Sequence, residues 1–275
     1  MTRSFVLTNH KGGVGKSTSA TNIALGMVRM LRSVNAINTR VLLIDTDSQG
    51  HATLVTTGRS DFGADNSLYG VLMAERKEAA RVMVDTIVRS HWDDDLHVLP
   101  ASPMLEAAER ELTGVAGAPY RLAEPLKRIA NNYAAVVIDT RPSFSLMTEM
   151  GLLAATDAIV PVEPRYLETV GLLSVIGKIN DIRDGWRHPS LHVSGILVTK
   201  MDARIKGHKQ LLDDLKAHSL LNQLLCGVIP ANEAVSYSHH SHLSIFEYDP
   251  KAPATKAYAK VVAGLLRQIL TKTEA

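Results

Sequence analysis

The chain has 275 residues, of which 45% are hydrophobic and 21% charged, and its formal net charge is +2 at pH 7. With this composition the chain can bury a sizeable core. The small net charge argues against a histone-like protein that binds nucleic acid over its whole surface. The one cysteine, Cys226, excludes a disulfide framework and also an iron–sulfur site, unless the residue is shared across a dimer. No apolar run approaches the ~20 residues that span a bilayer and no leader precedes the first strand, so we expect a cytoplasmic protein.

Short apolar runs alternate with longer helical patterns along the chain. Seven runs are typical of strands: RSFVLTN, RVLLID, DLHVLPA, AAVVIDT, DAIVPVE, HVSGILVTK and CGVIP. Helical patterns lie at about residues 17–32, after residue 67, up to about residue 184, and from about residue 252. Strand followed by helix, repeated, predicts an α/β fold with a doubly wound, mostly parallel sheet and helices on both faces. We interpret residues 1–275 as a single domain, with a surface loop at residues 58–66.

The segment NHKGGVGKST, residues 9–18, follows the first predicted strand and opens a helix. Its glycines let successive backbone N–H groups turn toward one phosphate, and the helix adds its positive N-terminal end. Lys16 is placed to reach the β- and γ-phosphates, and the Ser17 hydroxyl is placed to bind Mg²⁺. A glycine-rich turn with two solvated lysines is the alternative, which the flanking strand and helix disfavour. We assign the whole loop to nucleotide binding: Gly12, Gly13, Val14, Gly15, Lys16, Ser17 and Thr18.

Three aspartates stand where predicted buried strands end. LLIDTDSQG carries Asp45 and Asp47, and AAVVIDTRPS carries Asp139. A carboxylate at the carboxyl end of a buried parallel strand faces the crevice in which open α/β sheets bind ligands. Beside a phosphate loop, the three suit Mg²⁺ and an attacking water. Taken singly, each aspartate also suits a helix N-cap or a turn.

The order of several segments along the chain resembles the ParA family of partition ATPases. These segments are KGGVGKST, DTDSQGHATL, VVIDTRPS, PVEPRYLETVGL, VIPAN and IFEYDPKAPATKAY. The first matches the deviant Walker A motif of that family, KGGxGK[ST], and the resemblance runs nearly end to end. It implies a P-loop ATPase that uses ATP and Mg²⁺ and dimerises when ATP is bound.

The resemblance also implies why this phosphate loop carries two lysines. Lys16 would serve the ATP of its own subunit. The extra lysine, Lys11, would cross a nucleotide-sandwich homodimer and touch the phosphates bound by the other subunit, so that a second cation neutralises charge in the transition state. Pro230 and Asn232 of VIPAN join the nucleotide-binding residues by the same resemblance.

The aspartates receive their roles from the resemblance as well. Asp47 would position or activate the hydrolytic water, which makes it catalytic together with Lys11 and Lys16. Asp45 would support the magnesium shell, and Asp139 would hold Mg²⁺ through water.

The implied function is an ATP-driven DNA-binding switch. The ATP-bound dimer would coat nucleoid DNA without sequence preference, and a ParB-like adaptor would stimulate slow hydrolysis and release it. Cargo of such a switch is a plasmid, a chromosome origin or a protein assembly. A MinD-like ATPase that works on the membrane surface is the main alternative. A scaffold that binds nucleotide without hydrolysing it is disfavoured by the intact Lys16, Asp47 and Asp139.

The sequence departs from the usual pattern of the family in three segments. DSQGHAT replaces DPQGNAT, DTRPS replaces DTPPS, and IPAN stands where IPRN is frequent. Arg141 adds a positive charge near Asp139, and Ala231 removes a charge that often serves DNA binding. No long extension precedes the first strand, so we expect no sequence-specific operator binding.

Two short motifs suggest other ligands. VTKMD, residues 198–202, matches the [NT]-K-x-D motif by which GTPases read guanine, although the resemblance favours ATP. SHHSH, residues 238–242, suggests a metal site, but no cysteine or paired acid lies nearby in the sequence, and a structural site needs four ligands. We interpret this segment as a solvated loop.

Two basic segments are candidates for anion binding. KMDARIKGHKQ carries Arg204, Lys206 and Lys209 at the start of a helix, and we predict that these three residues bind DNA; a solvated helix face is the alternative. The next candidates lie near the C-terminus: Lys251, Lys256, Lys260 and Arg267. The last helix also has an apolar stripe of Val261, Val262, Leu265, Leu266 and Ile269. A membrane-surface helix would show such a stripe, but we expect core packing and membrane binding is not expected.

Overall fold

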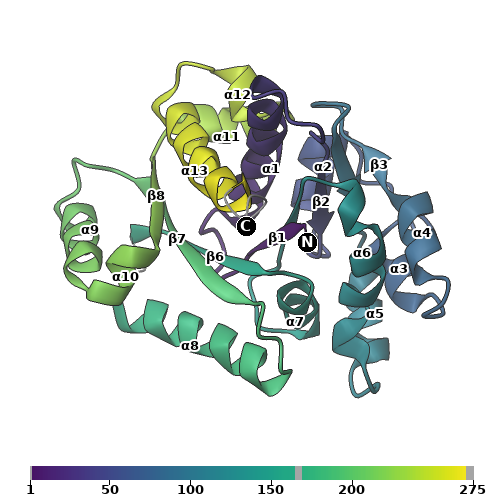
Figure 1. Ribbon diagram of the computed structural model, residues 1–275. Helices are drawn as coiled ribbons and strands as arrows, with labels where there is room; N and C mark the ends of the chain where they lie inside the picture. Colours follow the sequence, from purple (N-terminus) through teal and green to yellow (C-terminus); the bar gives the residue numbers. More distant parts are fainter. Residues whose placement is uncertain (1, 165–168, 271–275) are drawn as a thin grey trace.

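The described strands form one sheet. The computed structural model describes residues 2–164 and 169–270, without the side chains of residues 169, 170 and 268–270. The order of strands across the sheet is β3-β4-β2-β5-β1-β6-β7-β8 (Figure 1). The strands are β1 (Arg3–Leu7), β2 (Val41–Asp45), β3 (Val88–Arg89), β4 (Leu96–Leu99), β5 (Ala135–Asp139), β6 (Asp157–Val162), β7 (His192–Met201) and β8 (Leu225–Pro230).

The sheet is parallel except at one edge. The strands β4, β2, β5, β1, β6, β7 and β8 pair in parallel, and β3 pairs with β4 in the antiparallel sense. The seven predicted strands are therefore confirmed. The sequence did not predict β3, because two residues are too few to show a periodic pattern. One continuous sheet supports the interpretation of residues 1–275 as a single domain, which stays a prediction.

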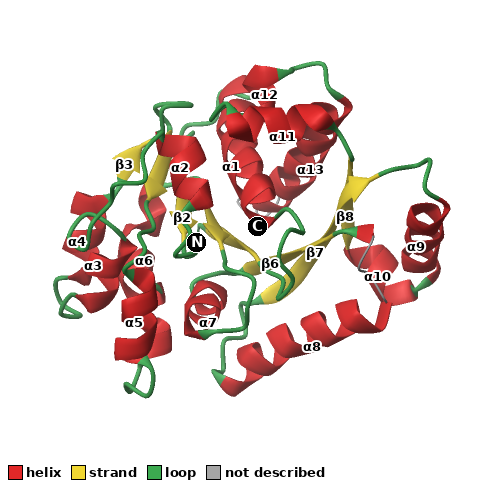
Figure 2. Cartoon of the chain, turned by 180° about the vertical axis from the view of Figure 1, so that it is seen from behind, coloured by secondary structure: helices red, strands yellow, loops and turns green. Residues whose placement is uncertain are grey.

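Helices cover both faces of the sheet, as predicted. Figures 1 and 2 show α1, α11, α12 and α13 on one side and α3 to α8 on the other. The helices are α1 (Lys16–Ser33), α2 (His51–Thr57), α3 (Leu68–Met73), α4 (Ala79–Thr86), α5 (Leu105–Leu112), η1 (Ala118–Tyr120), α6 (Ala123–Ile129), η2 (Ala130–Asn132), α7 (Leu146–Leu153), α8 (Thr169–Gly185), α9 (Lys206–Ala217), α10 (Ser219–Leu224), α11 (Glu233–His240), α12 (Ile245–Tyr248) and α13 (Pro253–Leu270). The predicted surface loop at residues 58–66 contains no helix or strand. Residues 165–168 of the segment PVEPRYLETVGL lie outside the described residues.

Alternate residues of each central strand enter two separate hydrophobic cores. In β1, Val6 packs into the core beneath α3 to α8, whereas Phe5 and Leu7 pack into the core beneath α1 and α13. Such strands are buried on both faces, which explains why their sequences are continuous apolar runs rather than alternating patterns. Both cores hold the sheet rigidly, so the carboxyl ends of β1, β2 and β5 have fixed relative positions.

The apolar stripe of the last helix is part of a core. Val261, Val262, Leu265 and Leu266 are buried against residues of α1 and the sheet, which confirms the expected packing; the side chain of Ile269 lies outside the described part. Among the described residues, no helix is long and apolar enough to span a bilayer.

The segment SHHSH differs from the expected solvated loop. Residues 238–240 complete α11, and Ser238 is fully buried. Burial lowers the pKa of His239 to about 4, so this imidazole is neutral at pH 7 and lends no positive charge to an anionic partner. In the described part of the chain, no group of three or more His, Cys, Asp or Glu is arranged to hold a metal ion.

Candidate nucleotide-binding and hydrolysis site

The loop between β1 and α1 has the backbone conformation that its glycines permit. Gly13 has φ of +73° and Gly15 has φ of +81°, both in the left-handed region that other residues rarely adopt. Gly15 is the N-cap of α1, so the first helical N–H groups face the loop. A loop of this shape at a helix N-terminus is a binding site for phosphate.

Buried side chains fix the first half of the loop. The Asn9 amide donates to the Pro161 carbonyl at 2.9 Å, and its Oδ1 accepts from the Lys11 N–H at 3.1 Å. The Lys16 ammonium donates to the Lys11 carbonyl at 2.8 Å. The backbone of Lys11 is therefore held on two sides, while its side chain is half-buried.

Residues at the end of β7 hold the second half of the loop. The Thr199 hydroxyl lies 2.9 Å from the Val14 carbonyl oxygen. Lys200 donates to the Gly13 carbonyl at 2.6 Å and to Glu163 Oε2 at 3.1 Å. These contacts were not predicted from the sequence. Thr199 and Lys200 belong to the VTKMD motif, which indicates recognition of the base rather than support of the phosphate loop.

Lys16 is the buried cation of the site, with 6% of its surface exposed. Burial lowers its pKa, and the nearby carboxylates Asp139 and Asp47 oppose that shift. An ammonium in this position gains from an anion that arrives at the loop, because little water screens the interaction.

Asp45 organises the loop that carries Asp47. One carboxylate oxygen of Asp45 accepts from the Thr53 N–H and hydroxyl, each at 2.8 Å, and the other accepts from the Asp47 N–H at 3.1 Å. Burial raises the pKa of Asp45 to about 6, and the hydrogen bonds from Thr53 oppose this. Both oxygens are thus engaged within the protein, which fits support of a magnesium shell better than direct ligation. Asp47 itself accepts from the Gln49 N–H at 3.1 Å.

Asp139 is the residue whose surroundings favour a bound cation. It is fully buried, and among the described residues neither of its carboxylate oxygens has a hydrogen-bond partner. Burial, and after it the charge of Asp45, raise the pKa of Asp139 well above its usual range; Ser17 lies near enough to oppose the shift, without the geometry of a hydrogen bond. Buried carboxylates without partners are costly, and a cation removes that cost.

The residues of the site fit Mg²⁺ bound together with a nucleotide. Asp139 and the Ser17 hydroxyl lie beside the phosphate loop, and Mg²⁺ commonly takes one or two protein oxygens while phosphate and water complete its shell. Such an ion would be held by Ser17 and by Asp139, with Asp45 behind it. When bound, Mg²⁺ would neutralise the phosphate charge that grows during hydrolysis.

Comparisons with known proteins agree on one family. A family model described as an AAA domain matches residues 2–193. The chromosome-partitioning ATPase Soj of Thermus thermophilus is 33% identical over 267 residues, which cover 97% of this chain and 96% of that protein. The chromosome partitioning protein ParA of Caulobacter vibrioides is 32% identical over 273 residues, which cover 98% and 94%. The chain belongs to the ParA family.

One similar protein of known structure has an ATP analogue and magnesium bound. Cobyrinic acid a,c-diamide synthase of Mycobacterium smegmatis, bound to an ATP analogue and magnesium, has a TM-score of 0.76 and is 27% identical, and the match covers 98% of this chain and 96% of that one. This ParA-family chain is thus an ATPase whose cofactors are ATP and Mg²⁺, as predicted. The individual site residues stay predictions, which the geometry described above supports.

Two of the predicted nucleotide-binding residues lie at the end of another strand and at the start of the helix that follows it. Pro230 ends β8, and Asn232 caps α11 by accepting from the Ala234 N–H at 3.0 Å. Because β8 is separated from β1 by β6 and β7, these residues would meet the nucleotide at its base rather than at its phosphates. In the neighbouring VTKMD, the Asp202 carboxylate accepts two hydrogen bonds from the Arg204 guanidinium at 3.0 and 2.8 Å. The carboxylate that would read guanine is therefore already engaged.

The predicted DNA-binding residues are exposed but not equivalent. Lys206 and Lys209 lie in the first turn of α9 and Arg204 lies just before it, all three on the surface. The charge of Arg204 is compensated by Asp202. Lys206 and Lys209 are therefore the better candidates for phosphate contacts. The alternative cations near the C-terminus are also exposed: Lys251, Lys256, Lys260 and Arg267.

Proposed function

We propose that this ParA-family ATPase is a DNA-binding switch. ATP joins two copies into a dimer, the dimer binds duplex DNA without sequence preference, and an adaptor protein stimulates slow hydrolysis and so ends the bound state. The observation that carries the proposal is the second lysine of the phosphate loop, whose backbone is fixed by Asn9 and Lys16. The relatives of this chain include a chromosome-partitioning ATPase, so the proposed cargo is DNA or an assembly carried along DNA.

The position of Lys11 supports a role outside its own subunit. Lys16 already points into the loop, where its ammonium bonds the Lys11 carbonyl. Lys11 lies at the start of the same loop, five residues before Lys16, and its side chain is half-buried. A second ammonium in this loop is suited to phosphates presented by a second copy, where two opposite charges would meet with little water between them.

Lys11→Ala should separate nucleotide binding from dimerisation. We expect the variant to bind ATP with affinity within about threefold of the parent, because Lys16 and the loop N–H groups remain. We expect it to stay monomeric with ATP, because the cation that crosses the interface is gone. Light scattering on a sizing column with a non-hydrolysable ATP analogue distinguishes the monomer from the dimer. Lys127→Ala, which removes an exposed lysine of α6, is the control; a Lys11→Ala dimer as stable as the parent dimer would remove this role.

DNA binding should follow from the exposed cations at the start of α9. A dimer places two such patches on one particle, which makes DNA binding dependent on ATP. Contacts to phosphate are largely independent of sequence and weaken with salt, because each neutralised phosphate releases counterions. The proposal therefore predicts equal affinity for unrelated duplexes.

Lys206→Glu should weaken ATP-dependent binding to any duplex, by about fivefold for each phosphate that it no longer neutralises. The slope of log affinity against log salt should fall by ~0.9 for each such phosphate. Arg204→Glu should have a smaller effect, because its charge is already compensated by Asp202. Lys216→Glu in the last turn of the same helix is the matched control, about 15 Å along the axis. Fluorescence anisotropy on two duplexes at several salt concentrations measures all three; if Lys206→Glu leaves affinity unchanged, the C-terminal cations are the next site to test.

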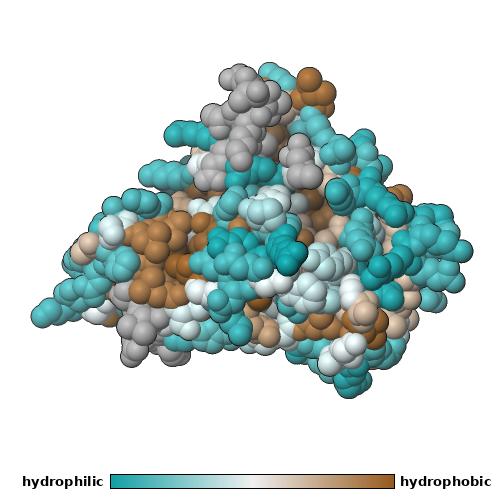
Figure 3. Space-filling view, turned by 60° about the horizontal axis from the view of Figure 1, so that its bottom comes forward, coloured by the Kyte–Doolittle hydropathy of each residue, from teal (hydrophilic) through white to brown (hydrophobic). Residues whose placement is uncertain are grey.

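An apolar patch on the surface is a candidate site for the proposed adaptor. Figure 3 shows a mostly hydrophilic face with a compact apolar patch, on the side of the molecule where α10 lies in Figure 1. Contiguous exposed apolar surface is typical of sites that another protein covers. A membrane-surface function is less well supported, because the apolar stripe of α13 is buried in the core. Sedimentation of the ATP-bound protein with liposomes or with DNA distinguishes the two functions.

A further inference from the structure

Helix α5 contacts two catalytic loops, the loop that carries Asp47 and the loop that follows Asp139, through two glutamates. Leu105, Ala108 and Leu112 bury one face of the helix. Glu106 and Glu109 are three residues apart and therefore lie on one face, next to the buried one. Each of them reaches a different loop at the carboxyl edge of the sheet.

The first contact holds the loop that carries Asp47. The hydroxyl of Ser48, a residue that is 4% exposed, donates to Glu106 Oε1 at 3.1 Å. Ser48 lies between Asp47 and Gln49, whose N–H bonds the Asp47 carboxylate. The direction of the Asp47 side chain thus depends on a loop that α5 restrains.

The second contact holds the loop that follows Asp139. Arg141 donates to Glu109 Oε2 at 2.5 Å, and both side chains are about three-quarters buried. The positive charge that Arg141 brings near the metal aspartate is therefore neutralised by α5. Three residues further on, the Phe144 ring stacks on His10 of the phosphate loop, with 6.2 Å between ring centres.

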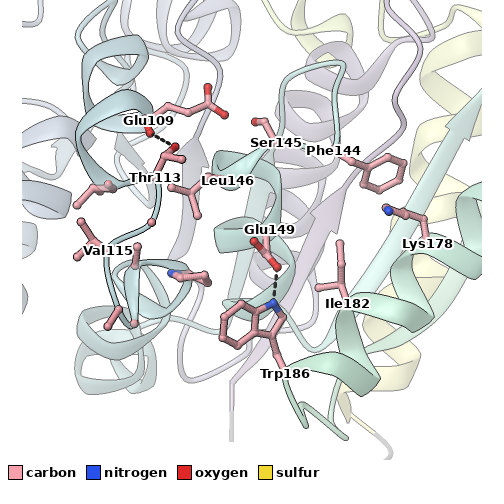
Figure 4. Close-up of a pocket in the computed structure, with 16 residues that line it drawn as sticks. Glu109, Thr113, Val115, Phe144, Ser145, Leu146, Glu149, Lys178, Ile182 and Trp186 are labelled. Carbon is pink, nitrogen blue, oxygen red and sulfur yellow. Dashed lines mark hydrogen bonds between the residues drawn. The ribbon is translucent and has the colours of Figure 1, made fainter.

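Glu109 and Phe144 also border a groove of about 600 Å³ between α5, α7 and α8. Figure 4 shows Glu109 and Phe144 in the upper part of the view, on opposite sides, with Glu149 and Trp186 below and between them. The contact between Glu109 and Arg141 therefore lies at the edge of a surface groove.

We propose that α5 is a clamp in which Glu106 and Glu109 act as positioning residues for hydrolysis. Glu106 sets the loop of Asp47 through Ser48, and Glu109 sets the loop of Asp139 through Arg141. Because one rigid helix holds both loops, the carboxylate that orients water and the carboxylate that holds the metal keep a fixed separation. This inference rests on the proposed function, because it assigns a role within the same hydrolysis reaction.

A charge swap across the second contact tests the clamp. Glu109→Arg and Arg141→Glu, each alone, should lower kcat roughly tenfold while KM for ATP changes less than about threefold, since small displacements of catalytic groups slow the chemical step more than binding. The double swap restores opposite charges at the same two positions, and should bring kcat back to within about threefold of the parent. Glu111→Arg, on an exposed position of the same helix, is the control for the change in charge.

The first contact is tested by a conservative pair. Glu106→Gln keeps an oxygen that accepts from Ser48 and should retain kcat within about threefold, whereas Glu106→Ala should lose roughly tenfold. Hydrogen exchange of the nucleotide-free protein gives a readout that does not depend on hydrolysis. The amides of residues 48–50 should exchange faster in Glu106→Ala, and those of residues 141–145 should exchange faster in each single swap variant. The melting temperature of these variants should not change.

Several results would overturn the clamp. They are a double swap no better than the worse single variant, a Glu111→Arg protein as slow as Glu109→Arg, or loop exchange that does not change. A parent protein that hydrolyses no ATP would instead overturn the proposed function, and the exchange data would still test the clamp.

Discussion

Asp47→Ala is expected to bind ATP and form the dimer, yet to hydrolyse ATP about 100-fold more slowly, since positioned general bases contribute factors of this size or larger. The carboxylate of Asp47 lies beside the buried cation Lys16, which its charge stabilises. The hydrogen bonds described above that hold the phosphate loop do not involve Asp47, so the affinity for ATP should change little. The DNA-bound state should accumulate, because the step that ends it is slowed. Single-turnover hydrolysis and anisotropy on DNA measure the two effects.

The control for this variant is Asp94→Ala, which removes an exposed aspartate from a turn. It should behave as the parent protein does. The parent should itself be slow without its adaptor, because a switch must persist until the adaptor arrives. A parent rate near ~10 per second, the median for enzymes, would contradict the switch and indicate a metabolic enzyme instead.

The central sheet could be predicted because its strands are buried on both faces. VLLID and AVVID are short, continuous and rich in branched residues, and they form the adjacent strands β2 and β5. The pairing places Asp45 opposite Asp139, which brings two predicted carboxylates together. The end of α11 was harder to predict, because SHHSH is polar in sequence and the burial of Ser238 and His239 comes from tertiary packing.

The conformation of the phosphate loop could be predicted because a turn of this kind needs glycines at particular positions. Two glycines have positive φ, one lysine is buried, and a serine follows. The supports of this loop could not be predicted. Thr199 and Lys200 are 185 and 187 residues from their partners Val14 and Gly13, and contacts over such separations leave no periodic signal. The same holds for Arg141, whose partner Glu109 lies on a helix that no motif marks.

Lys16→Ala should lose affinity for the nucleotide itself, by roughly 10- to 100-fold, because a hydrogen bond to a charged group contributes about 1.5–3 kcal/mol. Dimerisation, DNA binding and hydrolysis should fail with it at ATP concentrations that saturate the parent. Titration with a fluorescent ATP analogue in the presence of Mg²⁺ gives the affinity. The contrast with Lys11→Ala, which keeps affinity and loses the dimer, separates the two lysines of the loop.

Stability distinguishes this loss of binding from a loss of folding. Lys16 is buried, and burial lowers its pKa, so its removal relieves the cost of an ammonium in a dry site. The variant also loses the hydrogen bond from the Lys16 ammonium to the Lys11 carbonyl, and a bond from a charged group contributes about 1.5–3 kcal/mol. These effects oppose each other, and the melting temperature of the nucleotide-free protein should change by only a few degrees. ATP and Mg²⁺ should raise the melting temperature of Lys16→Ala less than that of the parent and of the control Lys77→Ala, an exposed lysine. An equal rise in Lys16→Ala would remove Lys16 from the phosphate site.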